Sequence, residues 1–259
     1  MRNSFCWFNI IILSLVTFNT LGQQVKYTKF DISLVGGSSL PVGSYGNKSP
    51  SKSAIYVNGS QVKGFAKGKS GFAKMGYYYN AEIKYKLSSS LKLLILIDTY
   101  SNPIETDGMS DFMTQLYGNK ETKVEEESYR FFYINPGVGY YYSLNKFDFG
   151  FNIFMGYSIT NFPYYKVVYL FSMANPPLIF AHVGPRPNLD AFTLGTSLSA
   201  TYHIFNRFRI GIDVLYQRAN FAYNMSPELI PGGGGANLTF SDILKVRVLN
   251  TGLKIGYCF

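Results

Sequence analysis

Alternation of apolar and polar residues recurs along most of the chain. In residues 191–204, every second position from Phe192 to Ile204 is mainly apolar, and the positions between them carry Thr, Gly, Ser and His. Successive side chains of a β-strand point to opposite sides, so a period of two predicts a strand with two different faces. The same period predicts seven further strands, which cover residues 29–36, 77–87, 91–98, 132–144, 147–159, 208–217 and about 249–259.

The lengths of the connections predict how these eight strands are arranged. The turns near residues 88, 145 and 206 are short, whereas residues 37–68, 101–128, 160–190 and 220–242 form long connections. An up-and-down barrel of eight strands with both termini at one end needs three connections there and four at the other end. Short periplasmic turns and long extracellular loops are typical of outer-membrane barrels. We therefore predict an all-β, eight-stranded antiparallel up-and-down transmembrane β-barrel.

Alternation alone leaves a soluble lipocalin-like barrel or a β-sandwich open, because those folds turn their apolar face inward. Composition favours the membrane interpretation: aromatic residues make up 17% of the chain and charged residues only 15%, against about 25% charged residues in soluble domains. The polar faces are rich in small residues that fit a crowded lumen, and the apolar faces often end in Tyr or Phe, as membrane-interface girdles do. Pro136 has no N–H to donate and is expected to mark a bulge in the strand at 132–144.

The first 22 residues are typical of a signal peptide. Arg2 is followed by an apolar run from Phe5 to Val16 and by small residues before Gln23. A transmembrane anchor is the alternative, but it needs about 20 apolar residues. Cys6 precedes the apolar core, so we expect no lipoprotein. The sequence predicts a cleaved leader at 1–22 and a barrel at 23–259.

The remaining composition excludes several kinds of site. Without the leader the chain keeps one cysteine, Cys258, and two scattered histidines, so we expect no internal disulfide, no metal and no cofactor. The net charge is +9, but the basic residues are spread along the chain and form no nucleic-acid motif. We therefore expect no nucleic-acid partner and interpret the basic surface as solvated or facing lipopolysaccharide.

The C-terminal strand carries a family resemblance. Its one-sided apolar residues resemble the assembly signal that the barrel assembly machinery recognises, with Ile255 at a place where an aromatic residue is commoner; they are Leu253, Ile255, Tyr257 and Phe259. With the strand plan, the chain resembles small OmpA/OmpX-type barrels and, within them, the Bacteroidetes outer-membrane β-barrel (porin-family) proteins. The segment 39–43, just after the first predicted strand, is similar to a Leu-Pro-x-Gly element common there. The resemblance implies an outer-membrane location and transfers no catalytic residue.

Charged residues on the polar faces are expected to point into the lumen. An eight-stranded barrel is only wide enough for side chains to fill, and buried charges must be paired. We therefore predict a lumen plugged by ion pairs, with a narrow pore or a small-hydrophobe carrier as the alternative. The predicted lumen charges are Asp31, Glu82, Lys84, Lys92, Asp98, Asp148, Arg209, Asp213 and Lys254.

The long connections differ in charge. Residues 37–74 carry six lysines and no acid, whereas residues 101–128 have a net charge of −5. We interpret both as solvated faces, and leave open whether they dock on each other or serve partners. The connection at 160–190 is strongly apolar and is predicted to contact an envelope protein, to extend strands above the membrane or to fold over the barrel mouth; its candidate residues are Tyr164, Tyr165, Tyr169, Phe171 and Phe180.

Candidate catalytic residues are few. His182 lies in a Pro-rich connection and His203 on a polar face beside a short turn, and neither has a nucleophile and an acid at an established spacing. A lipid A-modifying enzyme is therefore the less favoured hypothesis. We expect a non-enzymatic barrel that serves envelope structure or surface interaction through its loops, alone or as a subunit of a larger envelope or secretion assembly.

Overall fold

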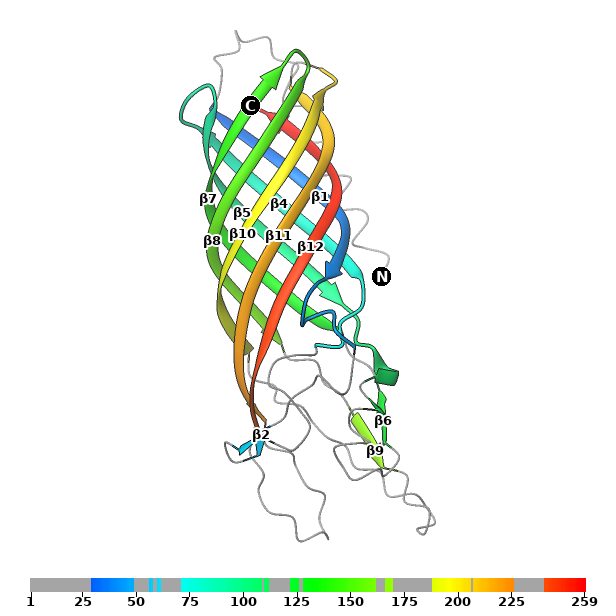
Figure 1. Ribbon diagram of the computed structural model, residues 1–259. Coiled ribbons are helices and arrows are strands. Elements are labelled where there is room, and N and C mark those ends of the chain that lie inside the picture. Colours follow the sequence, from blue (N-terminus) through cyan, green and yellow to red (C-terminus); the bar gives the residue numbers. More distant parts are fainter. Residues whose placement is uncertain are drawn as a thin grey trace, which may run out of the picture.

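Eight long strands close into a barrel in the computed structural model (Figure 1). Each strand pairs antiparallel with the next, and β1 pairs with β12 to close the ring. The structure describes residues 29–48, 56–57, 60–61, 71–108, 110–111, 122–125, 128–161, 166–169, 188–205, 207–225 and 240–259. The barrel strands are β1 (Phe30–Pro41), β4 (Gly76–Lys86), β5 (Leu91–Asn102), β7 (Tyr129–Leu144), β8 (Phe147–Asn161), β10 (Asn188–His203), β11 (Phe208–Met225) and β12 (Phe240–Cys258).

Four short strands lie in the long connections. A hairpin of β2 (Tyr56–Val57) and β3 (Ser60–Gln61) continues the sheet from the start of β12. The strands β6 (Thr122–Glu125) and β9 (Lys166–Tyr169) pair only with each other, which joins two long connections. Within the described residues, no helix has the length and hydrophobicity needed to cross a membrane.

The connections alternate in length as the sequence predicts. Short turns at 87–90, 145–146 and 204–207 lie at the same end of the barrel as Cys258, which pairs with Asp31 at the start of β1. We call this the turn end. The strand ends that the four long connections join lie at the opposite end of the barrel, the loop end (Figure 1). Asn145 has φ +55° in a two-residue hairpin turn, a left-handed conformation that Asn adopts more readily than most residues.

Several strands are longer than the alternation predicts. β12 begins at Phe240 rather than near residue 249, and β11 continues to Met225. β1 extends to Pro41, so the Leu-Pro pair lies inside the strand instead of after it. The prediction was wrong because polar side chains occupy outward positions near the loop end. Arg218 and Arg247 interrupt the apolar series while the β11–β12 pairing continues to Met225 and Phe240.

Pro136 does not mark a bulge. It faces Ile95 of β5, and the pairs of β7 with β8 keep the same offset at Ile134 and at Gly137. The ladder to β8 lacks pairs at Asn135 and Pro136 and then resumes in register. The β7–β8 ladder therefore accommodates Pro136, which has no N–H, by leaving two pairs unformed. No extra residue is inserted, as a bulge would require.

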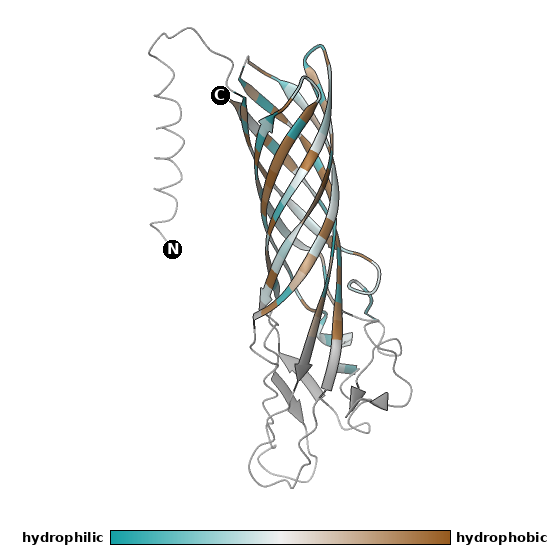
Figure 2. Ribbon diagram, turned by 90° about the vertical axis from the view of Figure 1, so that its left-hand side faces the viewer, coloured by the Kyte–Doolittle hydropathy of each residue, from teal (hydrophilic) through white to brown (hydrophobic). Residues whose placement is uncertain are grey.

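The apolar face of the strands points outward. The seven alternate residues of β8 from Phe147 to Ile159 are each 40–53% exposed, whereas Asn152, Phe154 and Ser158 between them are buried. Figure 2 shows hydrophobic and hydrophilic positions alternating along the barrel strands. A lipocalin-like barrel or a β-sandwich would bury this apolar face, so the soluble alternatives do not describe this barrel.

Candidate functional site

Side chains of two kinds fill the lumen. Near the turn end lies a charged half, and near the loop end lies an aromatic half. The charged half consists of Asp31, Glu82, Lys84, Lys92, Asp148, Arg209, Asp213 and Lys254. The aromatic half consists of Tyr45, Phe72, Tyr100, Tyr129, Phe131, Tyr133 and Phe221.

Arg209 organises the first ion-pair cluster of the charged half. Its guanidinium contacts the carboxylates of Asp31 and Asp148, the latter at 3.3 Å. Asp31 also accepts a hydrogen bond from Lys92 Nζ at 2.5 Å, and His203 Nε2 lies 2.7 Å from Asp148 Oδ2. Because these residues come from five strands, β1, β5, β8, β10 and β11, the cluster crosses the lumen.

Lys254 organises the second cluster. Its Nζ lies 2.6 Å from Glu82 Oε2 and 3.0 Å from Asp213 Oδ1, and Lys84 also contacts Glu82. All four side chains are almost completely buried. Two carboxylates and two ammonium groups balance each other, as buried charges require.

Tyr141 lies between the two clusters. The Nζ atoms of Lys92 and Lys84 lie 4.5 and 5.3 Å from its ring centroid, within the range of cation–π contacts. The ring lies against Gly139 and Gly150, where a Cβ would come within 2.7 and 2.6 Å of ring carbons. These two glycines are therefore required by the close approach of the Tyr141 ring.

Asp98 differs from the other predicted lumen charges. It accepts a hydrogen bond from Asn135 Nδ2 at 3.2 Å and faces Asn80 across the β4–β5 ladder. In the described part of the chain, no cationic side chain lies within ion-pair distance of it. The structure thus places Asp98 among amides, between the two halves, and outside the ion-pair clusters.

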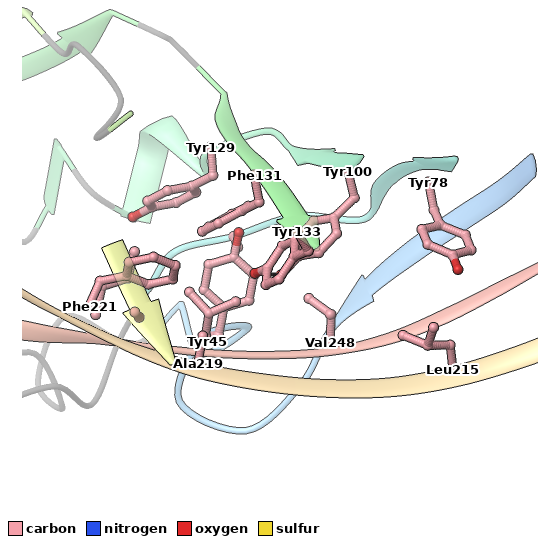
Figure 3. Packing of buried hydrophobic residues seen from close by; sticks show 14 of the residues in the cluster. Tyr45, Tyr78, Tyr100, Tyr129, Phe131, Tyr133, Leu215, Ala219, Phe221 and Val248 are labelled. Carbon is pink, nitrogen blue, oxygen red and sulfur yellow. Dashed lines mark hydrogen bonds between the residues drawn. The ribbon is translucent and has the colours of Figure 1, made fainter. Parts of the chain in front are cut away.

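The aromatic half is a cluster of rings in stacked, tilted and edge-on contact (Figure 3). The rings of Tyr100 and Tyr133 stack at 5.2 Å, and their hydroxyl groups are hydrogen bonded. Phe131 lies 4.9 Å from Tyr100 and 5.6 Å from Phe221, measured between ring centroids. Sequence reasoning missed this half, because an inward Tyr or Phe carries the same apolar signal as one that faces lipid.

Segments of the connections fold into the loop end and complete the aromatic half. Tyr45 is buried, packs edge-on against Tyr129 at 5.4 Å and lies 3.3 Å from Asn102 Oδ1 through its hydroxyl. Asn102 donates through Nδ2 to the carbonyl oxygens of Ser39, at 3.1 Å, and Lys74, at 3.0 Å. The end of β5 therefore holds two connection segments over the lumen.

The described parts of the basic and acidic connections dock on each other. The Lys74 N–H donates to Pro103 O at 2.7 Å, and Glu105 donates through its N–H to Phe72 O at 2.6 Å. Lys48 Nζ lies 3.0 Å from Glu105 Oε2. Part of the opposite charge of residues 37–74 and 101–128 is thus paired within the molecule.

The structure describes only some of the remaining predicted residues. Leu253 and Ile255 of the expected assembly signal point outward, and Tyr257 packs between Phe208 and Phe259 at 5.1 and 5.0 Å. Tyr169 ends β9 opposite Thr122. Within the described ranges, no group of three His, Cys, Asp or Glu side chains could hold a metal ion. The leader, His182 and four predicted patch residues lie outside the described residues; the latter are Tyr164, Tyr165, Phe171 and Phe180.

Comparisons with known proteins bear on the fold. No family model and no curated protein matches the chain. The outer membrane protein OprG from Pseudomonas aeruginosa is similar in structure, with a TM-score of 0.55 and 12% identity over 90% of this chain and 98% of that one. Neisserial surface protein A has a TM-score of 0.41 and 8% identity over 91% and 100% of the chains. Outer membrane protein W of Escherichia coli has a TM-score of 0.34 and 14% identity over the same shares. The likeness to OprG shows the class of fold, a closed eight-stranded up-and-down β-barrel that occurs in outer-membrane proteins.

Proposed function

We propose that this chain is an integral outer-membrane β-barrel with a closed lumen, which acts through its outer wall and its loop end. The observation that carries the proposal is the combination of an apolar outer wall and a lumen filled in both halves. Its role is then envelope structure or surface interaction, alone or as a subunit of a larger assembly. Catalysis is not part of the proposal.

The outer wall supports the membrane location. Large apolar side chains are exposed on every barrel strand, an extent of apolar surface that soluble monomers rarely show. A band of this kind matches the lipid-facing surface of transmembrane barrels. We expect the leader at 1–22 to direct export and the C-terminal strand to engage the barrel assembly machinery.

The filled lumen supports a closed barrel over a narrow pore or a small-hydrophobe carrier. A solute would have to pass the Tyr100–Tyr133 stack and then the two clusters of ion pairs. The stack and the clusters together involve side chains from all eight barrel strands. Opening either half would leave buried charges or aromatic rings without their partners. This cost favours a lumen that stays shut.

The loop end supports a role in surface interaction. Three of the four long connections are joined there, by the docking of 42–48 and 71–74 on 103–105 and by the β6–β9 pair. Ordered connections on a rigid barrel are the usual position for binding residues. We expect an envelope protein or lipopolysaccharide as the partner of this end.

Two measurements on the full chain test the proposal. Membranes of the expressing bacterium are washed with urea at high pH, and the detergent-extracted protein is run on gels with and without boiling. We expect the protein to stay with the outer membrane and to change mobility on boiling. In planar bilayers we expect no unitary conductance. A protein that is soluble without detergent would overturn the membrane location, and regular single-channel steps would overturn the closed lumen.

A further inference from the structure

The outer wall of β11 and β12 changes character abruptly near the loop end. Along the β11–β12 ladder, the outward pair Tyr216–Leu249 is apolar, and the next outward pair is Arg218–Arg247. The pair after that is Asn220–Lys245. Two neighbouring strands therefore pass from apolar to cationic side chains at the same register.

Arg218 and Arg247 stand directly opposite each other. Both are exposed, and the described residues supply neither of them with an acidic ion-pair partner. Like charges that face each other across a ladder destabilise it. Such a pair is stabilised when an anion binds between the two guanidinium groups.

A groove of about 370 Å³ lies beside the two arginines. Its lining combines the two guanidinium-bearing residues with apolar side chains of β10, and consists of Phe192, Leu194, Arg218, Ala219, Asn220 and Arg247. Phe192 is 61% exposed and lies on β10 just before the pairs of Thr193 with Ala219 and of Leu194 with Arg218. The groove therefore places two cationic side chains beside apolar side chains.

We propose that Arg218 and Arg247 bind a phosphate group of a phosphorylated glycolipid, lipid A, in the outer leaflet. An acyl chain of the same molecule then lies along Leu194 and Tyr216, on the side of the arginines toward the turn end. The planar fork of arginine binds phosphate oxygens in pairs, which favours a phosphate as the anion. This inference rests on the proposed outer-membrane location, in which the loop end faces outward and the limit of the apolar wall lies at the level of the lipid headgroups.

Arg130 provides a matched control on the other side of the barrel. It is an exposed arginine near the loop end of β7, but its ladder partners are Ser101 and Asn161. It therefore lacks the second cation that the proposed site requires. Replacing it removes one outward arginine and leaves the Arg218–Arg247 pair unchanged.

The experiment measures binding of bisphosphorylated lipid A to the full-length barrel in detergent by native mass spectrometry. We expect the double variant R218Q/R247Q to bind at least about tenfold more weakly than the parent, a loss of about 1.4 kcal/mol. R130Q should bind like the parent. Lipid A stripped of its phosphates should bind as weakly to the parent as intact lipid A binds to the double variant, and inorganic phosphate at the same concentration should not displace the lipid.

A second readout separates binding from folding. In detergent without lipid A, R218Q should raise the unfolding midpoint because it removes a like-charge contact; in vesicles with lipid A it should lower the midpoint because it removes a phosphate ligand. Equal lipid A binding by the parent and the double variant, or an equal loss in R130Q, would overturn the site. Displacement of lipid A by inorganic phosphate would show that the site binds a free anion and not the lipid. Each of these failures occurs in an inserted barrel, whereas failure of the proposed membrane location yields a soluble protein and failure of the closed lumen yields single-channel conductance.

Discussion

The charged half and the aromatic half close the same lumen with different interactions. All eight members of the charged half lie on barrel strands, so closing the barrel brings them together. The aromatic half needs Tyr45 and Phe72, which lie on connections and enter the lumen at the loop end. The turn end is therefore specified by strand register, whereas the loop end also depends on where two connections dock.

The two halves should also respond differently to a single substitution. In the charged half, removal of one cation leaves buried carboxylates with fewer cationic partners or with none of the present ones, and breaking a buried ion pair is costly. In the aromatic half, neighbouring rings and connection segments can move into part of the space that is left. We therefore expect the largest losses of stability at the turn end and progressively smaller ones toward the loops.

The largest effect is expected for Lys254→Met. This change leaves Glu82 and Asp213 with only Lys84 among their present ion-pair cations, and breaking a buried pair costs about 3–5 kcal/mol. The measurement is urea unfolding in lipid vesicles, followed by circular dichroism. Leu253→Met is the control, because the adjacent residue faces outward and keeps its volume. An equal effect of the two substitutions would show that the charged half does not depend on pairing.

A smaller effect is expected for Phe131→Ala in the aromatic half. Its ring contacts Tyr100, Tyr45 and Phe221, and its loss should lower the free energy of unfolding by about 3 kcal/mol, the lower end for a buried Phe. Phe132→Ala is the matched control on the lipid side. Lipid chains can fill the space there, so only the transfer contribution of about 1.5 kcal/mol is lost.

Conductance measurements on the same two variants test whether the lumen stays closed. Because the charged half remains intact, neither Phe131→Ala nor Phe132→Ala should form a channel in planar bilayers. Unitary conductance in Phe131→Ala alone would mean that the aromatic half is the only closure of the lumen. The two halves would then no longer act in series.

The sequence was informative about the fold and the charged half for one reason. A period of two assigns each residue to a face, and an Asp, Glu, Lys or Arg on the polar face has only the lumen to enter. This reasoning identifies Asp31, Glu82 and Lys254, and the three-short, four-long pattern of connections fixes the number of strands. It cannot identify the partners, because Asp31 and Arg209 meet only when β1 and β11 are placed in one barrel.

The aromatic half could not be predicted by the same reasoning. Phe131 and Phe132 are adjacent and chemically identical, yet one enters the lumen and the other faces outward. The insertion of Tyr45 depends on hydrogen bonds to Asn102, some 57 residues away. The outer ends of β11 and β12 were missed because Arg218 and Arg247 replace the apolar residues that carry the strand signal.

A moderate effect is expected for Asn102→Asp, which tests how the connections are held over the loop end. The change keeps the shape but replaces the Nδ2 donor with an oxygen that faces the carbonyls of Ser39 and Lys74. Loss of two buried hydrogen bonds should cost about 2 kcal/mol. We expect faster proteolysis within 42–48 with an unchanged barrel by circular dichroism. Asn102→Ser, which keeps a donor, should be intermediate; unchanged proteolysis in Asn102→Asp would show that the connections dock without this residue.

The smallest effect is expected for the ion pair between Lys48 and Glu105, which joins the basic and acidic connections above the aromatic half. The two side chains are 50% and 23% exposed, so water and salt screen their attraction. A double-mutant cycle with Lys48→Gln and Glu105→Gln should give a coupling free energy of about 0.5 kcal/mol, and the value should fall as salt is raised. Backbone hydrogen bonds from Glu105 to Phe72 and from Gly71 to Ser44 remain in every variant, so the connections should stay docked. A coupling as large as the loss in Lys254→Met would mean that charge, and not backbone pairing and ring packing, closes the loop end as well.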